Sequence, residues 1–120
     1  MKILLIDDDI FLRDMYATKF TESGDTVEGA ADAAEALRMI EGAAYDVVIL
    51  DMVMPGMSGL EFLKALREID SAKDTKCIVL SNQGESVDVK AAQDLGVLGY
   101  IIKAETIPSE VVEKVHNLVS

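Results

Sequence analysis

The chain has 120 residues, of which 50% are hydrophobic and 28% are charged, enough for one globular domain and too few for two. It carries 22 acidic residues against 11 Lys and Arg, a net charge of −11 at pH 7, which disfavours binding to nucleic acid or to an anionic membrane. The one cysteine, Cys77, excludes an internal disulfide and a zinc site of several cysteines. Because we find neither an apolar run of membrane-spanning length nor a signal peptide, we expect a soluble, cytoplasmic, single domain over residues 1–120.

Five short apolar runs predict five strands, at residues 3–6, 26–30, 47–50, 77–80 and 100–102. The runs are bounded by turn residues and are mostly rich in β-branched side chains, and the run at 26–30 is the weakest of them. The runs at 3–6 and 47–50 are apolar throughout instead of alternating. This pattern indicates strands of a parallel sheet that is covered on both faces.

Segments with apolar residues at helical spacing lie between and after these runs, at 11–20, 33–40, 60–69, 87–95 and 111–118. Asp32 with Glu35 and Ser58 with Glu61 have the spacing of a capping box, and Pro108 suits the first turn of the last helix. Strand and helix thus alternate five times. The alternation predicts an α/β fold of the (βα)5 type, with a doubly wound, five-stranded parallel sheet and right-handed crossovers.

Polar side chains follow four of the predicted strands. They are Asp7, Asp8 and Asp9 after the first, Asp51 after the third, Ser81 after the fourth and Lys103 after the fifth. Ligands of open parallel sheets bind beyond the carboxyl ends of the strands, so these groups belong to one edge. If the first and third strands are neighbours, about 4.8 Å apart, their carboxylates converge and need a cation between them. With no His or Cys nearby in the sequence, oxygen ligands alone favour Mg²⁺ over zinc.

Each of these residues also has an ordinary structural explanation. Aspartate is common in turns, Asp9 suits the cap of the following helix, Ser81 suits another cap, and Lys103 suits a solvated charge. Four such groups at one edge of a sheet nevertheless favour a site. A carboxylate can accept a phosphoryl group when a cation and further donors hold the phosphoryl oxygens. Asp8 could hold the metal, while Lys103 and Ser81 could hold the phosphoryl group.

From Lys2 to its C-terminus the chain resembles the receiver domain of two-component response regulators. The resemblance rests on ILLIDDD at residues 3–9, VILDMVMPGMSG at 48–59, IVLS at 78–81 and Lys103, which occur in the family's order. It implies a flavodoxin-like fold with sheet order 2-1-3-4-5. It also implies that Asp51 is the phosphoacceptor, that Lys103 is the active-site lysine, and that the chain is a signalling domain and not a turnover enzyme.

The resemblance also implies a Mg²⁺ site and its ligands. Asp8, Asp51 and the backbone carbonyl of Val53 would bind the ion, and Asp7 would act on it through water. The phosphoryl donor would be a histidine kinase or a histidine phosphotransfer protein.

A switch at Ser81 and Tyr100 is the next implication of the resemblance. Phosphorylation would draw the Ser81 hydroxyl inward, and Tyr100 would swing from an exposed to a buried position. The face formed by the fourth helix, the fifth strand and the fifth helix would then change shape and bind a downstream protein. A homodimer linked to phosphorylation is left open.

Several residues around the expected pocket modify the family pattern. Ala104 stands where proline usually follows Lys103, and a cis bond before Ala104 would cost about 2.5–4 kcal/mol, so we expect a trans bond and a reshaped loop. Asn82 is larger than the usual Ala or Gly and either crowds the pocket or donates a hydrogen bond. Val53 and Gln83 flank the pocket. Because an apolar Val53 cannot orient a hydrolytic water, we expect a long-lived phosphoryl group.

Other functional classes share parts of this pattern. A small haloacid-dehalogenase-like phosphohydrolase would use Asp7 as nucleophile and Asp9 as acid/base, but Ile10 departs from its motif and the chain is short for its usual cap. A flavodoxin-like cofactor binder would place a phosphate where three aspartates repel it. An inactive, protein-docking receiver conflicts with the intact set of polar residues.

Overall fold

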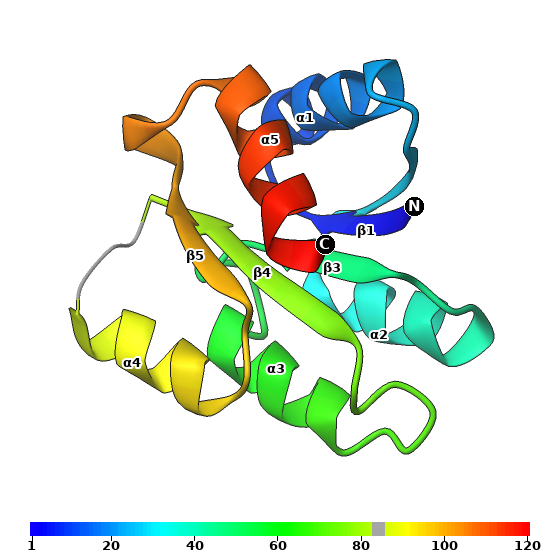
Figure 1. The fold of residues 1–120 in the computed structure, drawn as a ribbon. Coiled ribbons are helices and arrows are strands. Elements are labelled where there is room, and N and C mark those ends of the chain that lie inside the picture. Colours follow the sequence, from blue (N-terminus) through cyan, green and yellow to red (C-terminus); the bar gives the residue numbers. More distant parts are fainter. Residues whose placement is uncertain (83–85) are drawn as a thin grey trace.

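The computed structural model describes residues 1–82 and 86–120, and within them a parallel sheet lies between two layers of helices (Figure 1). The elements are β1 (Lys2–Ile6), α1 (Ile10–Glu22), β2 (Thr26–Ala30), α2 (Ala33–Gly42), β3 (Val47–Leu50), α3 (Gly59–Arg67), β4 (Lys76–Ser81), α4 (Ser86–Asp94), β5 (Gly99–Ile102), the 3₁₀ turn η1 (Lys103–Glu105) and α5 (Pro108–Val119). The predicted (βα)5 alternation is confirmed, and each helix overlaps the segment of helical spacing that predicted it.

All neighbouring strands are parallel and follow the order β2-β1-β3-β4-β5, as the resemblance implied. Ile6 of β1 lies opposite Ala30 of β2 on one side and opposite Leu50 of β3 on the other. The next residues along β1 and β3 are Asp7 and Asp51. This register brings the two aspartates side by side at the carboxyl edge of the sheet.

Different helices cover the two faces of the sheet (Figure 1). On one face, alternate strand residues pack with α2, α3 and α4, and they include Leu4, Ile6, Val48, Leu50 and Val79. On the other face, the intervening residues pack with α1 and α5, and they include Ile3, Leu5, Val47, Ile49 and Ile78. Since both faces of the central strands are buried, neither can be polar, which explains why β1 and β3 are apolar throughout.

Local capping fixes where several helices begin. Asp9 accepts two backbone N–H groups at the start of α1, and Asp32 accepts the N–H of Glu35 in α2. Ser58 and Glu61 form a reciprocal capping box at the start of α3. In the part of the chain described, no helix combines the length and the apolar character needed to cross a membrane.

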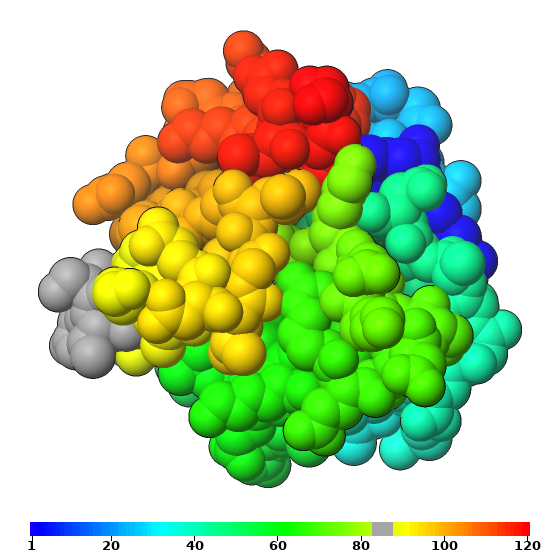
Figure 2. All heavy atoms as spheres, turned by 60° about the horizontal axis from the view of Figure 1, so that its bottom comes forward, coloured from blue at the N-terminus to red at the C-terminus, as the bar shows by residue number. Residues whose placement is uncertain are grey.

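α4, β5 and α5 form a continuous face of the molecule. Figure 1 places β5 between α4 and α5, and Figure 2 shows the yellow, orange and red surfaces of these elements in contact. β5 is an edge strand of the sheet, so this face lies at that edge of the sheet. It is the surface that the resemblance implied for output.

Arg67, the last residue of α3, ties three segments together through backbone carbonyls. Its Nε donates to Leu95 O at 3.0 Å and its Nη2 to Gly96 O at 3.4 Å, at the end of α4. Its Nη1 donates to Lys73 O at 2.9 Å and to Thr75 O at 2.7 Å, just before β4. A planar guanidinium has enough donors for all four bonds, which an ammonium group lacks.

We expect Arg67→Met to lower the free energy of unfolding by about 1.5–3 kcal/mol, because carbonyls now bonded to a charged group lose their partner. Urea denaturation measures the change. Arg38→Met, at an exposed position on α2, is the matched control and should change stability by less than about 0.5 kcal/mol. Equal effects of the two substitutions would contradict the role of Arg67.

Candidate functional site

An open pocket of about 320 Å³ lies at the carboxyl edge of the sheet. Its lining comes from the ends of β1, β3, β4 and β5 and from the start of α1, and consists of Asp7, Asp8, Asp9, Leu12, Asp51, Val53, Ser81, Asn82 and Lys103. The polar groups that sequence reasoning assigned to one edge are therefore brought together. Gln83, which was also expected at this pocket, lies outside the described residues.

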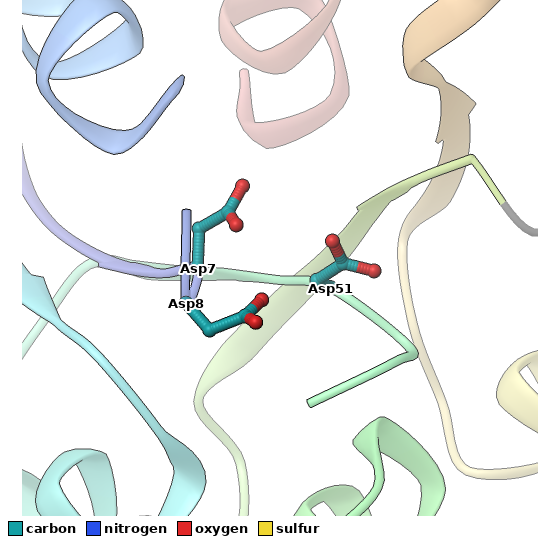
Figure 3. Close-up of side chains that lie close together, drawn as sticks. All are labelled: Asp7, Asp8 and Asp51. Carbon is teal, nitrogen blue, oxygen red and sulfur yellow. The ribbon is translucent and has the colours of Figure 1, made fainter. Parts of the chain in front are cut away.

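Asp7, Asp8 and Asp51 form an acidic cluster over the ends of β1 and β3 (Figure 3). One carboxylate oxygen from each residue lies within 4.8 Å of the others. Asp7 is only 2% exposed, whereas Asp8 opens to solvent. Several carboxylates and room for water are the donor set that Mg²⁺ prefers, so these residues fit that ion.

Lys103 joins two of the three carboxylates. Its Nζ lies 2.6 Å from Asp7 Oδ2 and 2.8 Å from Asp51 Oδ2, and its side chain is 7% exposed. Burial by itself lowers the pKa of Lys103, but the hydrogen bonds and charges of Asp51 and Asp7 together outweigh it and raise that pKa above its usual value. The ammonium group therefore stays charged at neutral pH.

The loop after Lys103 adapts to the absence of proline. The Lys103–Ala104 bond is trans, as expected, and the described residues contain no cis peptide bond. Residues 103–105 form the turn η1, which closes with a bond from Thr106 N to Lys103 O at 3.3 Å. The lysine reaches both carboxylates from this turn, so alanine at position 104 does not shorten its reach.

Ser81 links Asp51 to Tyr100. The Ser81 hydroxyl is fully buried and donates to Asp51 Oδ1 at 2.8 Å. Burial raises the pKa of Tyr100, the charges of Asp88 and Asp51 raise it further, and a hydrogen bond with Ser81 lowers it. The hydroxyl of Ser81 is thus shared between the acidic site and the aromatic residue on β5.

Gly59, the first residue of α3, allows the helix to lie directly on the Asp51 loop. Its N–H donates to Met52 O at 2.9 Å. A Cβ at position 59 would come within 2.7 Å of the carbonyl oxygen of Asp51 and within 2.8 Å of Met52 Cα. Only glycine fits this close approach without a backbone shift. Sequence reasoning included Gly59 in a motif but did not find this role.

Three further residues named from the sequence, Val53, Asn82 and Asp9, also line the pocket. Val53 is 59% exposed, lines the pocket, and donates its backbone N–H to Asp51 Oδ1 at 3.1 Å. Metal binding by its carbonyl stays a prediction. Asn82 is exposed at the pocket, and either effect expected of it stays open. Asp9 lines the pocket but caps α1, which confirms its ordinary explanation.

Two residues of α1 that sequence reasoning missed lie close to this site. Tyr16 is buried, and burial raises its pKa, while the charge of Lys103 lowers it and the charge of Asp7 raises it. Arg13 donates from Nη1 to the Asp7 carbonyl at 2.7 Å. Neither residue belongs to a recognisable motif, because their positions depend on how α1 packs.

Lys103 should make the protein less stable at alkaline pH. A folded-state pKa above the usual value of 10.5 means that its stabilising effect is complete below that pH and is lost as the pH rises through the folded-state pKa. Over that interval we expect wild type to lose up to about 1.4 kcal/mol per pH unit more than Lys103→Met. Urea unfolding from about pH 9 to 12 measures the slopes. Lys114→Met, exposed on α5, is the control, and parallel slopes for wild type and Lys103→Met would contradict the prediction.

The chain matches the model of the response regulator receiver domain over residues 3–116. It is 29% identical to the chemotaxis protein CheY of Pseudomonas aeruginosa, over 100% of this chain and 99% of CheY. It is 32% identical to the sporulation initiation phosphotransferase F of Bacillus subtilis, over 85% of this chain and 81% of that protein. The chain spans 45% of the length of another relative, the two-component response regulator PhoP of Pseudomonas aeruginosa, with 31% identity and 86% of this chain covered.

The solved structures that resemble this chain include proteins of the same kinds. The chemotaxis protein CheY4 of Vibrio cholerae superposes with a TM-score of 0.90 at 32% identity, covering 98% of this chain and 97% of CheY4. The response regulator TrrA of Thermotoga maritima, solved in complex with Mg²⁺ and BeF, superposes with a TM-score of 0.84 at 32% identity, again over 98% and 97% of the two chains. The sequence match, the sheet order and the acidic pocket agree, and the chain belongs to the family of response regulator receiver domains.

Proposed function

We propose that Asp51 accepts a phosphoryl group in a Mg²⁺-dependent reaction and that this modification is the signal the domain transmits. The observation that supports the proposal most directly is the pair of donors on Asp51. Lys103 Nζ lies 2.8 Å from Oδ2, and Ser81 Oγ lies 2.8 Å from Oδ1. The carboxylate is thus held at both oxygens, beside two further carboxylates that fit a cation.

The donor is proposed to be a phosphohistidine of a histidine kinase or of a histidine phosphotransfer protein, the partners of response regulator receiver domains. One Asp51 oxygen forms a bond to phosphorus as the phosphorus–nitrogen bond of the donor breaks, and the histidine leaves with the bonding pair. A bound Mg²⁺ would neutralise charge on the phosphoryl oxygens. Lys103 and Ser81 already point at Asp51, so they can pass to the new oxygens with little rearrangement.

The same hydroxyl is proposed to start the switch. When Ser81 turns from Asp51 to a phosphoryl oxygen, its hydrogen bond with Tyr100 changes as well. Tyr100 lies on β5, and β5 lies between α4 and α5 in the face that these three elements form (Figure 1). A downstream protein, or a second copy of the chain, is proposed to recognise that face. On this proposal the domain acts as a cytoplasmic signalling module and not as a turnover enzyme.

Hydrolysis of small phosphate esters has less support. The dehalogenase-like reaction would need Asp9 as acid/base, but its Oδ1 accepts the N–H groups of Phe11 and Leu12. Asp7, the nucleophile of that reaction, is buried and paired with Lys103.

Intact-mass measurement tests the phosphoacceptor directly. After treatment with acetyl phosphate and Mg²⁺, we expect wild type to gain one phosphoryl mass and Asp51→Asn to gain none, because the amide cannot act as the nucleophile. Asp70→Asn, at an exposed position away from the pocket, is the control and should be labelled like wild type. Labelling that survives in Asp51→Asn would contradict the assignment.

Val53 is expected to prolong the phosphoryl state, because an exposed apolar side chain at the pocket cannot orient an attacking water. Val53→Asn adds a hydrogen-bonding group and should speed loss of the label several-fold. The decay is followed by mass after removal of the phosphodonor, in buffer with Mg²⁺. Val53→Ala, which adds no polar group, should decay like wild type. Rapid decay of the wild-type label would refute the prediction.

A further inference from the structure

We propose that Arg13 of α1 is a positioning residue for the acidic pair Asp7 and Asp8, and that Gly29 of β2 provides the space it needs. The inference rests on the proposed cation site, and it concerns two residues that no motif identified. Arg13 bonds to the backbone and not to a carboxylate, and its stem lies against a neighbouring strand.

The Asp7 carbonyl lies where the pairing of β1 with β2 ends. The last bond between these segments runs from Asp7 N to Ala30 O at 3.1 Å. Beyond it, Arg13 Nη1 donates to Asp7 O at 2.7 Å. Arg13 thus holds one more backbone group, the Asp7 carbonyl, beyond the last hydrogen bond between the two strands.

This bond controls the direction in which Asp8 leaves the strand. The carbonyl of Asp7 and the N–H of Asp8 belong to one planar peptide unit, so holding the carbonyl also orients that unit. The Asp8 carboxylate is exposed, and no described residue forms a hydrogen bond or an ion pair with it. Its place in the acidic cluster therefore depends on its backbone, which Arg13 holds through the Asp7 carbonyl.

Gly29 lets the Arg13 side chain lie across β2. A Cβ at position 29 would come within 3.0 Å of Arg13 Cδ and 3.1 Å of Arg13 Nε. A larger side chain at this position must displace the stem of the arginine, because the stem is flexible and the strand is not. Valine is a good strand former, so Gly29→Val displaces Arg13 without opposing the strand.

The sign of the effect separates positioning from simple charge. The positive charge of Arg13, which bonds to the backbone of one residue of the acidic cluster, would by itself weaken cation binding, and its removal would then tighten binding. Positioning predicts the reverse. Gly29→Val keeps the charge of Arg13 and only displaces its side chain, so it tests positioning alone.

The experiment is Mg²⁺ titration of the unphosphorylated protein by calorimetry, with thermal melting in the absence of Mg²⁺ as a measure of folding. We expect Arg13→Met and Gly29→Val each to weaken Mg²⁺ binding about tenfold. The double variant should bind no more weakly than Arg13→Met alone, because Gly29 acts through Arg13. Thr26→Val, exposed on the same strand, is the control and should bind like wild type.

Two outcomes would overturn the inference while the proposed function stands. They are wild-type or tighter binding by Gly29→Val, and a further loss in the double variant beyond that of Arg13→Met. Arg13→Lys, which keeps the charge but lacks the fork of donors, should also bind weakly and replaces Arg13→Met if that variant does not fold. A different result, wild type that fails to bind Mg²⁺ or Asp8→Asn that binds like wild type, would instead refute the proposed cation site.

Discussion

The contact on which the rest of the site depends is the ammonium group of Lys103 between Asp7 and Asp51. Carboxylates that lie this close repel one another, and removal from water makes each charge more costly. The lysine offsets both effects by donating to one oxygen of each aspartate. Its own burial is tolerated because those two bonds replace the water that it loses.

The sheet order makes this contact available. β1 and β3 are neighbours and are followed directly by Asp7 and Asp51, while β4 separates β3 from β5 and ends in Ser81. The lysine after β5 must therefore extend past the end of β4 to reach Asp51. Asp51 thus accepts hydrogen bonds from both Lys103 and the Ser81 hydroxyl. The acids, the hydroxyl and the lysine thus converge because all of them lie at the carboxyl edge of one parallel sheet.

Helices packed against the carboxyl edge of the sheet hold the backbone of the acidic cluster in place, which the strand ends alone would not do. Gly59 lets α3 press on the Asp51 loop, and Arg13 holds the Asp7 carbonyl from α1. The two helices lie on opposite faces of the sheet, so the acidic cluster is supported from both sides. Farther away, Arg67 of α3 bonds to the end of α4. These bonds anchor one end of a helix that belongs to the face formed by α4, β5 and α5. The site and that face meet at Ser81 and Tyr100, on adjacent strands.

The sequence by itself determined the alternation of strands and helices, the caps at Asp9, Asp32 and Ser58, and the single sheet edge that carries the polar groups. These features depend on periodicity and on neighbours a few residues apart, which are visible along the chain. The resemblance to a family added the sheet order, and it suggested the role that we propose for Asp51. Only the tertiary structure decided that Lys103, 96 residues from Asp7, reaches that carboxylate. The bonds of Arg13 and Arg67 to distant carbonyls, like the contact of Gly59 with the Asp51 loop, were equally invisible. They arise from the packing of elements against one another, and packing distances are not encoded in any local pattern.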